Sequence, residues 1–472
     1  MKNAKSAFAL FFGNRGLFPS SLIAEARATL SGQMRAWGYD TLMLDESATR
    51  YGAVETPAEG EKYANFLREN RGKYDGVILC LPNFGDETGA VSALKEAGVP
   101  ILIQAYPDEL DKMGPALRRD AFCGKLSIMD VFTQYGVKFT ALKPHVVSLS
   151  SEAFKAQVDY FDRVCQVVRG MRDMVVGAIG ARTTAFKTVR IDELALQRHG
   201  ITVETLDLSG VIDRVRGLPT SLPAYHDKVA FLTQYTSWKG VPEKALENLA
   251  KLGVVLDQII AEYRLDAYAI RCWLELQNQL GISPCVLMGA INSADFAAAC
   301  EVDLGSAIMM RALGLASARE VACLDWNNNY GDEADKCILF HCGPVPTKLM
   351  VDAGRVDDDV ILATSLGEGC SYGCNVGRIA PTEFTFGNLL TADGQLRFYL
   401  GEGRFTEDKV PDDFFGCAGV AEIPRLQDVL LHLGRTGHRH HVSITPNRVA
   451  APVREALEHY LDHVVTVPQA QS

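Results

Sequence analysis

The sequence predicts an α/β protein with two doubly wound, parallel-sheet domains followed by an antiparallel, β-rich and barrel-like C-terminal domain. The chain has 472 residues, which suggests about three domains at roughly 150 residues each. Up to about residue 350, short apolar runs alternate with helical periodicity, as in parallel α/β sheets. Beyond it, glycine becomes frequent and helical periodicity fades. We therefore expect domains at 1–170, 171–349 and 350–472.

The first segment alternates strand and helix patterns. Strands are expected at Phe8–Phe12, Thr41–Leu44, Gly76–Leu81 and Pro100–Gln104, with helices at Ser21–Trp37, 58–70 and Thr88–Ala97. Ligands of such sheets bind beyond the carboxyl ends of the strands. Asn14, Arg15 and Asn83 follow these ends, but neither a GxGxxG nor a P-loop pattern is present, so a nucleotide is not indicated.

An amphipathic helix at 150–172 is expected to link this segment to a second alternation. A helix is predicted at Lys244–Tyr263. Parallel strands are predicted at Met174–Ile179, Val203–Leu206, Ala267–Ile270, Cys285–Met288, Val321–Leu324 and Cys337–Phe340.

The last segment carries a strong hairpin signal. Phe384–Leu390 faces Gln395–Leu400 across Asp393-Gly394, a dipeptide that favours a tight two-residue turn. A barrel-like antiparallel domain follows from this pattern. A final helix is expected at Ala451–His463.

Composition excludes several classes of protein. With 47 basic and 58 acidic residues the net charge is −11, the wrong sign for a nucleic-acid or anionic-membrane partner. No apolar run is long enough to span a bilayer, and the N-terminal apolar run has no cleavage site of a signal peptide. The twelve scattered cysteines predict a reducing, cytoplasmic setting. The pairs Cys370/Cys374 and Cys337/Cys342 are interpreted as ordinary core or loop cysteines rather than a zinc site.

Acidic and histidine side chains fall just past apolar runs in the middle segment. These are Glu275, Glu301, Asp303, Asp325 and His341. If the strands are parallel, the side chains meet in one crevice, where clustered carboxylates are tolerable chiefly around a cation. For Asp303 alone, at the start of a helical pattern from Leu304 to Leu313, a helix cap is the alternative.

A histidine cluster, His438, His440 and His441, precedes β-branched residues near the C-terminus. It is either a source of an imidazole ligand or an unrelated histidine-rich turn. Two carboxylates and one imidazole, with positions left open for substrate oxygens, suit Mn²⁺, Mg²⁺ or Co²⁺ better than structural zinc.

Three stretches carry a family resemblance. They are Ala299-Cys300-Glu301-Val302-Asp303, Ile308-Met309-Met310 and Val321-Ala322-Cys323-Leu324-Asp325. Together with the domain order they resemble the L-fucose isomerase and L-arabinose isomerase superfamily. The resemblance implies that Glu301 and Asp325 are metal ligands and acid/base groups, and that the third ligand is His440, which we prefer, or His441. It places Glu275 and His341, more loosely, among the substrate-binding groups.

What the resemblance implies is metal-dependent interconversion of an aldose with its 2-ketose through a cis-enediol, Mn²⁺ being the expected metal. The alternatives are a non-catalytic sugar binder and a metal-dependent sugar lyase or aldolase. Some members of the superfamily act on the sulfonated sugar sulfoquinovose, and Arg435 or Arg439 would suit such an anion, unless both are exposed. Arg182 and Arg190 are further candidates.

The resemblance also implies a homo-oligomer, expected to be a hexamer. Asn14, Arg15 and Asn83 have no evident partner chemistry within their own segment. They are expected to cap the pocket of a neighbouring subunit.

Overall fold

The structure, a computed structural model, describes residues 5–470. The chain divides into two compact units. The first extends to Arg169 and includes His459–Leu461; the second runs from Gly170 to Glu458 and resumes at Asp462. The domain boundary expected near residue 349 stays a prediction.

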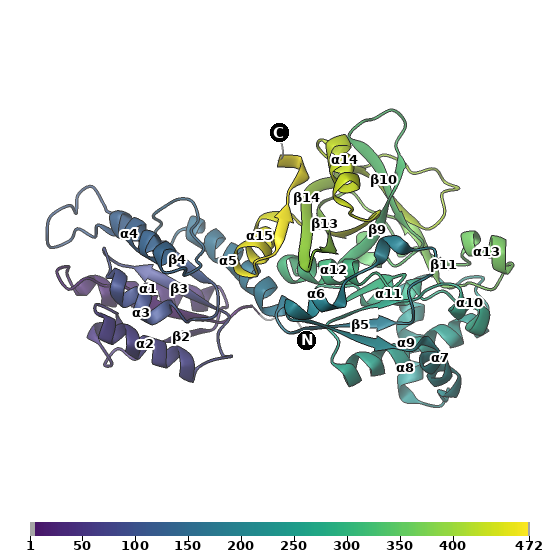
Figure 1. Cartoon of the computed structure of the whole chain (residues 1–472), viewed down its shortest axis with the longest axis horizontal. Coiled ribbons are helices and arrows are strands. Elements are labelled where there is room, and N and C mark those ends of the chain that lie inside the picture. Colours follow the sequence, from purple (N-terminus) through teal and green to yellow (C-terminus); the bar gives the residue numbers. More distant parts are fainter. Residues whose placement is uncertain (1–4, 471–472) are drawn as a thin grey trace. The chain divides into compact units, whose positions relative to one another are not determined.

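The first unit is built on a four-stranded parallel sheet in the order β2-β1-β3-β4. Every residue of β1 and β3 is buried, as expected for strands covered on both faces. The helices lie along this sheet in the purple-to-blue part of Figure 1. The elements are β1 (Phe8–Phe12), α1 (Ser21–Ala36), β2 (Thr41–Met43), η1 (Arg50–Gly52), α2 (Pro57–Glu69), β3 (Gly76–Leu81), α3 (Glu87–Leu94), β4 (Ile101–Ala105), α4 (Ala121–Gln134) and α5 (Glu152–Met171).

The second unit begins with another four-stranded parallel sheet, ordered β6-β5-β7-β8. Its strands are β5 (Met174–Ile179), β6 (Ile201–Leu206), β7 (Ala267–Ile270) and β8 (Ala297–Cys300). The helices around it are η2 (Lys187–Val189), α6 (Glu193–Arg198), α7 (Leu208–Gly217), α8 (Pro223–Tyr235), α9 (Glu243–Tyr263), α10 (Glu275–Leu280), α11 (Cys285–Ile291) and α12 (Leu304–Ser317).

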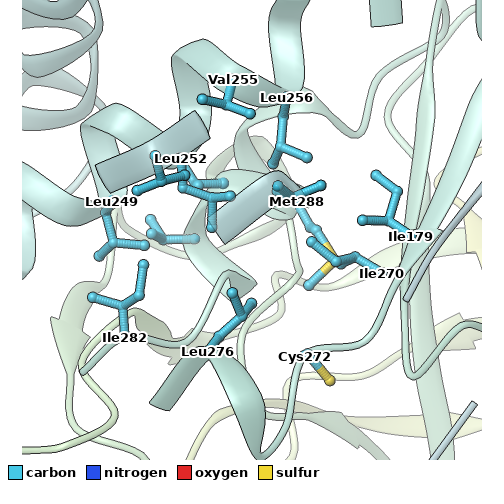
Figure 2. Packing of buried hydrophobic residues seen from close by; sticks show 14 of the residues in the cluster. Ile179, Leu249, Leu252, Val255, Leu256, Ile270, Cys272, Leu276, Ile282 and Met288 are labelled. Atoms are coloured by element: carbon cyan, nitrogen blue, oxygen red, sulfur yellow. The ribbon is translucent and has the colours of Figure 1, made fainter. Parts of the chain in front are cut away.

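Helix α9 covers this sheet through one apolar face. Apolar residues recur at intervals of three and four, so they lie on one side of the helix. Figure 2 shows them packed around Met288 of α11 and the ends of two strands. The labelled members are Ile179, Leu249, Leu252, Val255, Leu256, Ile270, Cys272, Leu276, Ile282 and Met288.

The third sheet has nine strands in the order β11-β12-β15-β10-β9-β16-β13-β14-β17, and a further β14–β15 pairing closes part of it into a barrel. The predicted hairpin is confirmed, with Ala392 opposite Gln395. The strands are β9 (Ala322–Asn329), β10 (Lys336–His341), β11 (Arg355–Asp357), β12 (Cys374–Arg378), β13 (Thr382–Ala392), β14 (Gln395–Phe405), β15 (Cys417–Glu422), β16 (His441–Thr445) and β17 (Val464–Thr466). The remaining helical segments are η3 (Thr347–Leu349), α13 (Val360–Leu366), α14 (Leu426–Thr436), α15 (Ala450–Arg454), η4 (Glu455–Tyr460) and η5 (Pro468–Ala470).

The predicted fold class is confirmed, but three predicted strands of the middle segment are wrong in type or place. Cys285–Met288 lies in helix α11, because a four-residue apolar run has no periodicity that distinguishes strand from buried helix. Strands β9 and β10 pair antiparallel with each other and belong to the third sheet. The final helix is also shorter, ending as α-helix at Arg454.

Helix α12 is shared by the two sheets of this unit. It contacts β5, β7 and β8 of the parallel sheet and β13 and β16 of the antiparallel sheet. Every residue of the helix except Arg311 is buried. Asp303, which belongs to the functional site described below, caps the N-terminus of this helix.

Within residues 5–470, none of the helices combines the length and apolar character needed to cross a bilayer.

Candidate metal centre

The site starts at the turn between β8 and α12. Glu301 and Val302 both adopt left-handed backbone conformations, with φ of 63° and 58°. Such conformations cost free energy for residues other than glycine and cluster at functional sites. The turn presents the Glu301 carboxylate to the site. Asp303, which follows Val302, caps α12 by accepting from the Ser306 backbone N–H at 3.1 Å. The cap interpretation of Asp303 is thereby confirmed.

Two strands of the third sheet supply the other side of the site. Asp325 of β9 and His441 of β16 stand directly opposite each other in an antiparallel pair. His341 ends the neighbouring strand β10, and its ring centroid lies 5.9 Å from that of His441. The sheet register therefore brings together residues that are far apart in the sequence.

Asp303 fixes the orientation of His441. Its buried carboxylate accepts from the Arg439 guanidinium, and its Oδ2 lies 2.7 Å from Nδ1 of His441. Since a carboxylate is only an acceptor, Nδ1 carries the proton. Nε2 then faces the other carboxylates. Burial would lower the pKa of His441, but without a cation the surrounding carboxylates raise it well above its usual value, so Nε2 is protonated. A bound metal ion would replace this proton and leave the Nδ1–H tautomer that metal-binding histidines use.

Unpaired acceptor atoms converge in front of Nε2. Glu301 Oε2 lies 2.9 Å and Asp325 Oδ1 3.5 Å from it. Both oxygens are buried and form no hydrogen bond with any part of the chain from residue 5 to 470. Within the same residues Nε2 of His341 is also buried and without a partner, but it is a donor, because Nδ1 of the same ring accepts from the Cys342 backbone N–H at 2.9 Å. The other oxygen of Glu301 accepts from Trp273 Nε1 at 3.1 Å. Buried lone pairs facing one another are costly unless a cation or a proton lies between them.

The electrostatics favour charged groups despite the burial. Burial alone would raise the pKa of Asp303, but Arg439 and His441 hold it well below its usual value. Burial would likewise raise the pKa of Glu301, but His441 and His341 lower it. Both carboxylates are therefore ionised at neutral pH. The charge of Asp303 is balanced by Arg439 and His441, and that of Glu301 is able to bind a cation.

Solvent reaches the site from one side. The side chains of Asp325 and His440 are 19% and 44% exposed, whereas His441 is 1% exposed. The Phe186 ring packs against His440 and Trp273, with centroids 5.7 and 5.3 Å apart. The reacting part of a ligand would enter past Asp325 and His440, with aromatic surface beside it.

The structure does not bring all predicted residues to this site. Arg435 is exposed on α14, and the buried Arg439 is committed to Asp303. The prediction that either clamps an anionic substrate is corrected, because neither guanidinium is free at the site. Glu275 pairs with Arg271 and borders a separate pocket of about 760 Å³ near the ends of β5 and β6, so it is not part of this cluster.

The predicted residues of the first unit bond within that unit. Asn14 and Asn83 are fully buried and hydrogen-bond to each other, and Asn14 also donates to Glu55. Arg15 pairs with Glu87. The expectation that these side chains lack partners in their own segment is wrong. Carboxylates of the same unit lie at this edge of the sheet, and hydrophobic periodicity could not predict their positions.

Two contributing residues were not predicted for the site, whereas Asp303 was placed in the crevice with a helix cap as the alternative. Trp273 and Phe186 come from loops after β7 and β5, and nothing in their sequence context indicated a role. They meet the site only through the sheet topology.

Two family models match the chain. Residues 9–172 match the model described as fucose/sulfoquinovose isomerase, N-terminal domain, and residues 339–467 match that of L-fucose isomerase, C-terminal domain. The second range includes His341, His440 and His441. Glu301 and Asp325 lie between the two ranges.

Similar curated proteins cover most of the chain. A sulfoquinovose isomerase of Alkalicoccus urumqiensis is 22% identical over 393 residues, covering 83% of this chain and 85% of that protein. The sulfoquinovose isomerases of Priestia aryabhattai and Priestia megaterium are each 21% identical over 389 residues, covering 81% of this chain and 84% of theirs.

Proposed function

Because this chain belongs to the fucose isomerase-like family and is an aldose-ketose isomerase, we propose that it works with a divalent cation held by Glu301, Asp325 and His441. The observation that carries the proposal is the convergence of buried, unpaired acceptor atoms on Nε2 of His441. His441 is preferred over His440, because Asp303 fixes its tautomer and it is buried between the two carboxylates. His341 lies close to Glu301 and His441 as well.

The donor set fits a hard or borderline cation. Two carboxylates and one imidazole suit Mn²⁺ best, with Co²⁺ or Mg²⁺ as alternatives, and leave positions for two sugar oxygens. A bound cation supplies Lewis-acid polarisation of the sugar carbonyl and of the neighbouring hydroxyl. Asp303 and Arg439 hold His441 in place, and Trp273 fixes one oxygen of Glu301.

The carboxylates then carry the protons. Either Glu301 or Asp325 removes the proton from C2 of the aldose, giving a cis-enediol, and returns it to C1 of the ketose. The other carboxylate transfers a proton between the two sugar oxygens, from O2 to O1. The lowered pKa of Glu301 leaves this carboxylate ionised at neutral pH and able to accept a proton, and the side chain of Asp325 is partly exposed to solvent.

The substrate we propose is a 6-sulfonated hexose of the sulfoquinovose type, in line with the activity for which the similar proteins are named. Since Arg439 is committed to Asp303, the cation for a sulfonate has to come from elsewhere. The loop after β5 carries Phe186, which packs on His440, and also Arg182. The Arg182 guanidinium donates to the Thr183 backbone carbonyl and forms no ion pair with the described carboxylates. This makes Arg182 the preferred sulfonate contact.

The first prediction tests the reaction. Incubated with Mn²⁺ and a panel of aldoses in D₂O, the protein should form 2-ketoses that carry carbon-bound deuterium, because a proton on a carboxylate exchanges with solvent. Mass spectrometry and NMR of the products measure the formation of ketose and its content of carbon-bound deuterium. Cleavage products would instead support a sugar lyase or aldolase, ligand binding without turnover would support a sugar-binding protein, and ketose without deuterium would argue against the enediol.

The second prediction concerns the sulfonate. Replacing Arg182 with Gln should lower kcat/KM for sulfoquinovose about tenfold or more, since a lost charge-assisted contact costs about 1–3 kcal/mol. The value for glucose at the same ionic strength should change little. Arg435→Gln, on the exposed face of α14, is the matched control and should leave both unchanged. Equal losses on both sugars would mean that Arg182 acts only on the loop structure.

The cytoplasmic location and the hexamer remain predictions from the sequence. The buried Asn14 and Asn83 no longer support a pocket-capping role, although Arg15 is partly exposed beside Glu87.

A further inference from the structure

A second group of potential ligands lies apart from the carboxylates. The thiols of Cys285, Cys342 and Cys374 lie within 4.8 Å of one another, and the first two are 3.3 Å apart. Cys285 and Cys374 are buried and Cys342 is nearly so. They begin α11, follow β10 and begin β12, respectively, so three separate segments deliver one thiol each.

The backbone is arranged to let these segments approach. Gly343 follows Cys342 and Gly373 precedes Cys374, with φ near 140° at both. A Cβ at Gly343 would lie 2.3 Å from the Asn375 nitrogen, and one at Gly373 would lie 1.8 Å from the Ser283 carbonyl oxygen. Only glycine permits these close backbone approaches, and the approaches bring the three thiols together.

A buried carboxylate lies beside one of these thiols. Asp359 is 5% exposed, and its Oδ2 lies 3.5 Å from the Cys374 thiol. Its other oxygen caps α13. Within the described residues Asp359 forms no ion pair, and burial raises its pKa to about 6. Oδ2 accepts from the Cys374 thiol, so loss of the thiol proton to a bound metal ion would leave this oxygen free to face the ion.

We propose that Cys285, Cys342, Cys374 and Asp359 form a second metal site, which takes a thiophilic divalent cation such as Zn²⁺. Three sulfurs and one oxygen are a usual donor set for a closed tetrahedral site, in which sulfurs bonded at about 2.3 Å lie about 3.8 Å apart. The Cys285 and Cys342 sulfurs are 3.3 Å apart and all three sulfurs lie within 4.8 Å of one another, so small side-chain shifts would reach that spacing. A Cys285–Cys342 disulfide would need a sulfur separation of about 2.05 Å and would leave Cys374 and Asp359 without a role.

A metal ion bound here would stabilise the fold and would take no part in the reaction at the sugar carbons. It joins α11, which packs in the core beside the parallel sheet, to β10 and β12 of the antiparallel sheet. Cys342 also follows His341 directly, so a bound ion would anchor the end of β10 that carries this histidine.

The test uses Co²⁺ as a probe in the full-length protein. Thiolate ligands give near-ultraviolet sulfur-to-cobalt charge-transfer absorption, which a site made of carboxylates and imidazole does not give. We expect one sulfur-bound ion per chain, displaced by Zn²⁺, with loss of this absorption in Cys374→Ser. Cys370→Ser and Cys337→Ser change cysteines outside the cluster and should keep it. Asp359→Asn should keep the absorption but weaken the affinity at least about tenfold.

Three outcomes would overturn the proposal. They are absence of the charge-transfer band in folded wild-type protein, an equally strong band in Cys374→Ser, and an intact mass showing a Cys285–Cys342 disulfide in protein purified under reducing conditions. Because the band does not depend on turnover, a failure here is distinguishable from a failure of the isomerase proposal. Circular dichroism of each variant checks that the fold is retained.

Discussion

Glu301→Gln and Asp325→Asn should each lower kcat by about 10³-fold or more and reduce Mn²⁺ binding, while the protein remains folded. Each change removes a negative charge and a proton acceptor from the site but keeps the shape of the side chain. General acid–base catalysis alone contributes about 10²–10⁴-fold, and loss of a ligand adds to this. Steady-state kinetics with added Mn²⁺, together with calorimetric titration of the metal, measures both effects.

Glu275→Gln is the matched control. It makes the same chemical change on a carboxylate that pairs with Arg271 outside the cluster, so kcat should be nearly unchanged. Wild-type turnover and metal content in either Glu301→Gln or Asp325→Asn would show that the metal is held elsewhere.

Asp303→Asn is expected to have the second largest effect, through His441 rather than through contact with a sugar. Asparagine caps a helix about as well as aspartate, so the start of α12 should survive. Its amide can no longer enforce the Nδ1–H tautomer of His441, and Mn²⁺ affinity should fall about 10–100-fold. Arg439 would also lose its buried partner, which costs about 3–5 kcal/mol of folding stability.

A double variant separates the two roles of Asp303. Asp303→Asn combined with Arg439→Met removes the unpaired buried charge, so the thermal stability should largely return. The metal affinity should stay low, because His441 still lacks its acceptor. If affinity and stability recovered together, Asp303 would be purely structural.

The sequence was sufficient to predict what depends on local periodicity. Strands β1, β3, β5 and β7 were predicted at their observed bounds, and the β13–β14 hairpin followed from Asp393-Gly394. Sheet membership was harder to predict. β9 and β10 were assigned to the parallel sheet, because the local sequence of a strand does not show which distant strand it pairs with.

For the site, the residues that follow strands directly were the predictable ones. Glu301 and Asp325 were selected in this way, and the structure places both beside His441. The choice between His440 and His441 needed the tertiary contacts of the two rings. Both lie close to Asp325, but His441 is buried against Glu301 and Asp303, whereas His440 is 44% exposed. Arg439 was misinterpreted because its partner, Asp303, is more than a hundred residues away in the chain.

The position of α12 between two sheets has a consequence for how the chain is made on the ribosome. One side of the helix is covered by β5, β7 and β8, which are synthesised before it, but the other awaits β13 and β16. At the usual elongation rate, roughly ten seconds pass between the synthesis of α12 and the synthesis of β16. During that interval the apolar stretch Ile308-Met309-Met310 lies in a helix whose outer side is incompletely covered. Nascent chains of this protein are therefore most prone to aggregation, and most in need of a chaperone, just before β16 emerges.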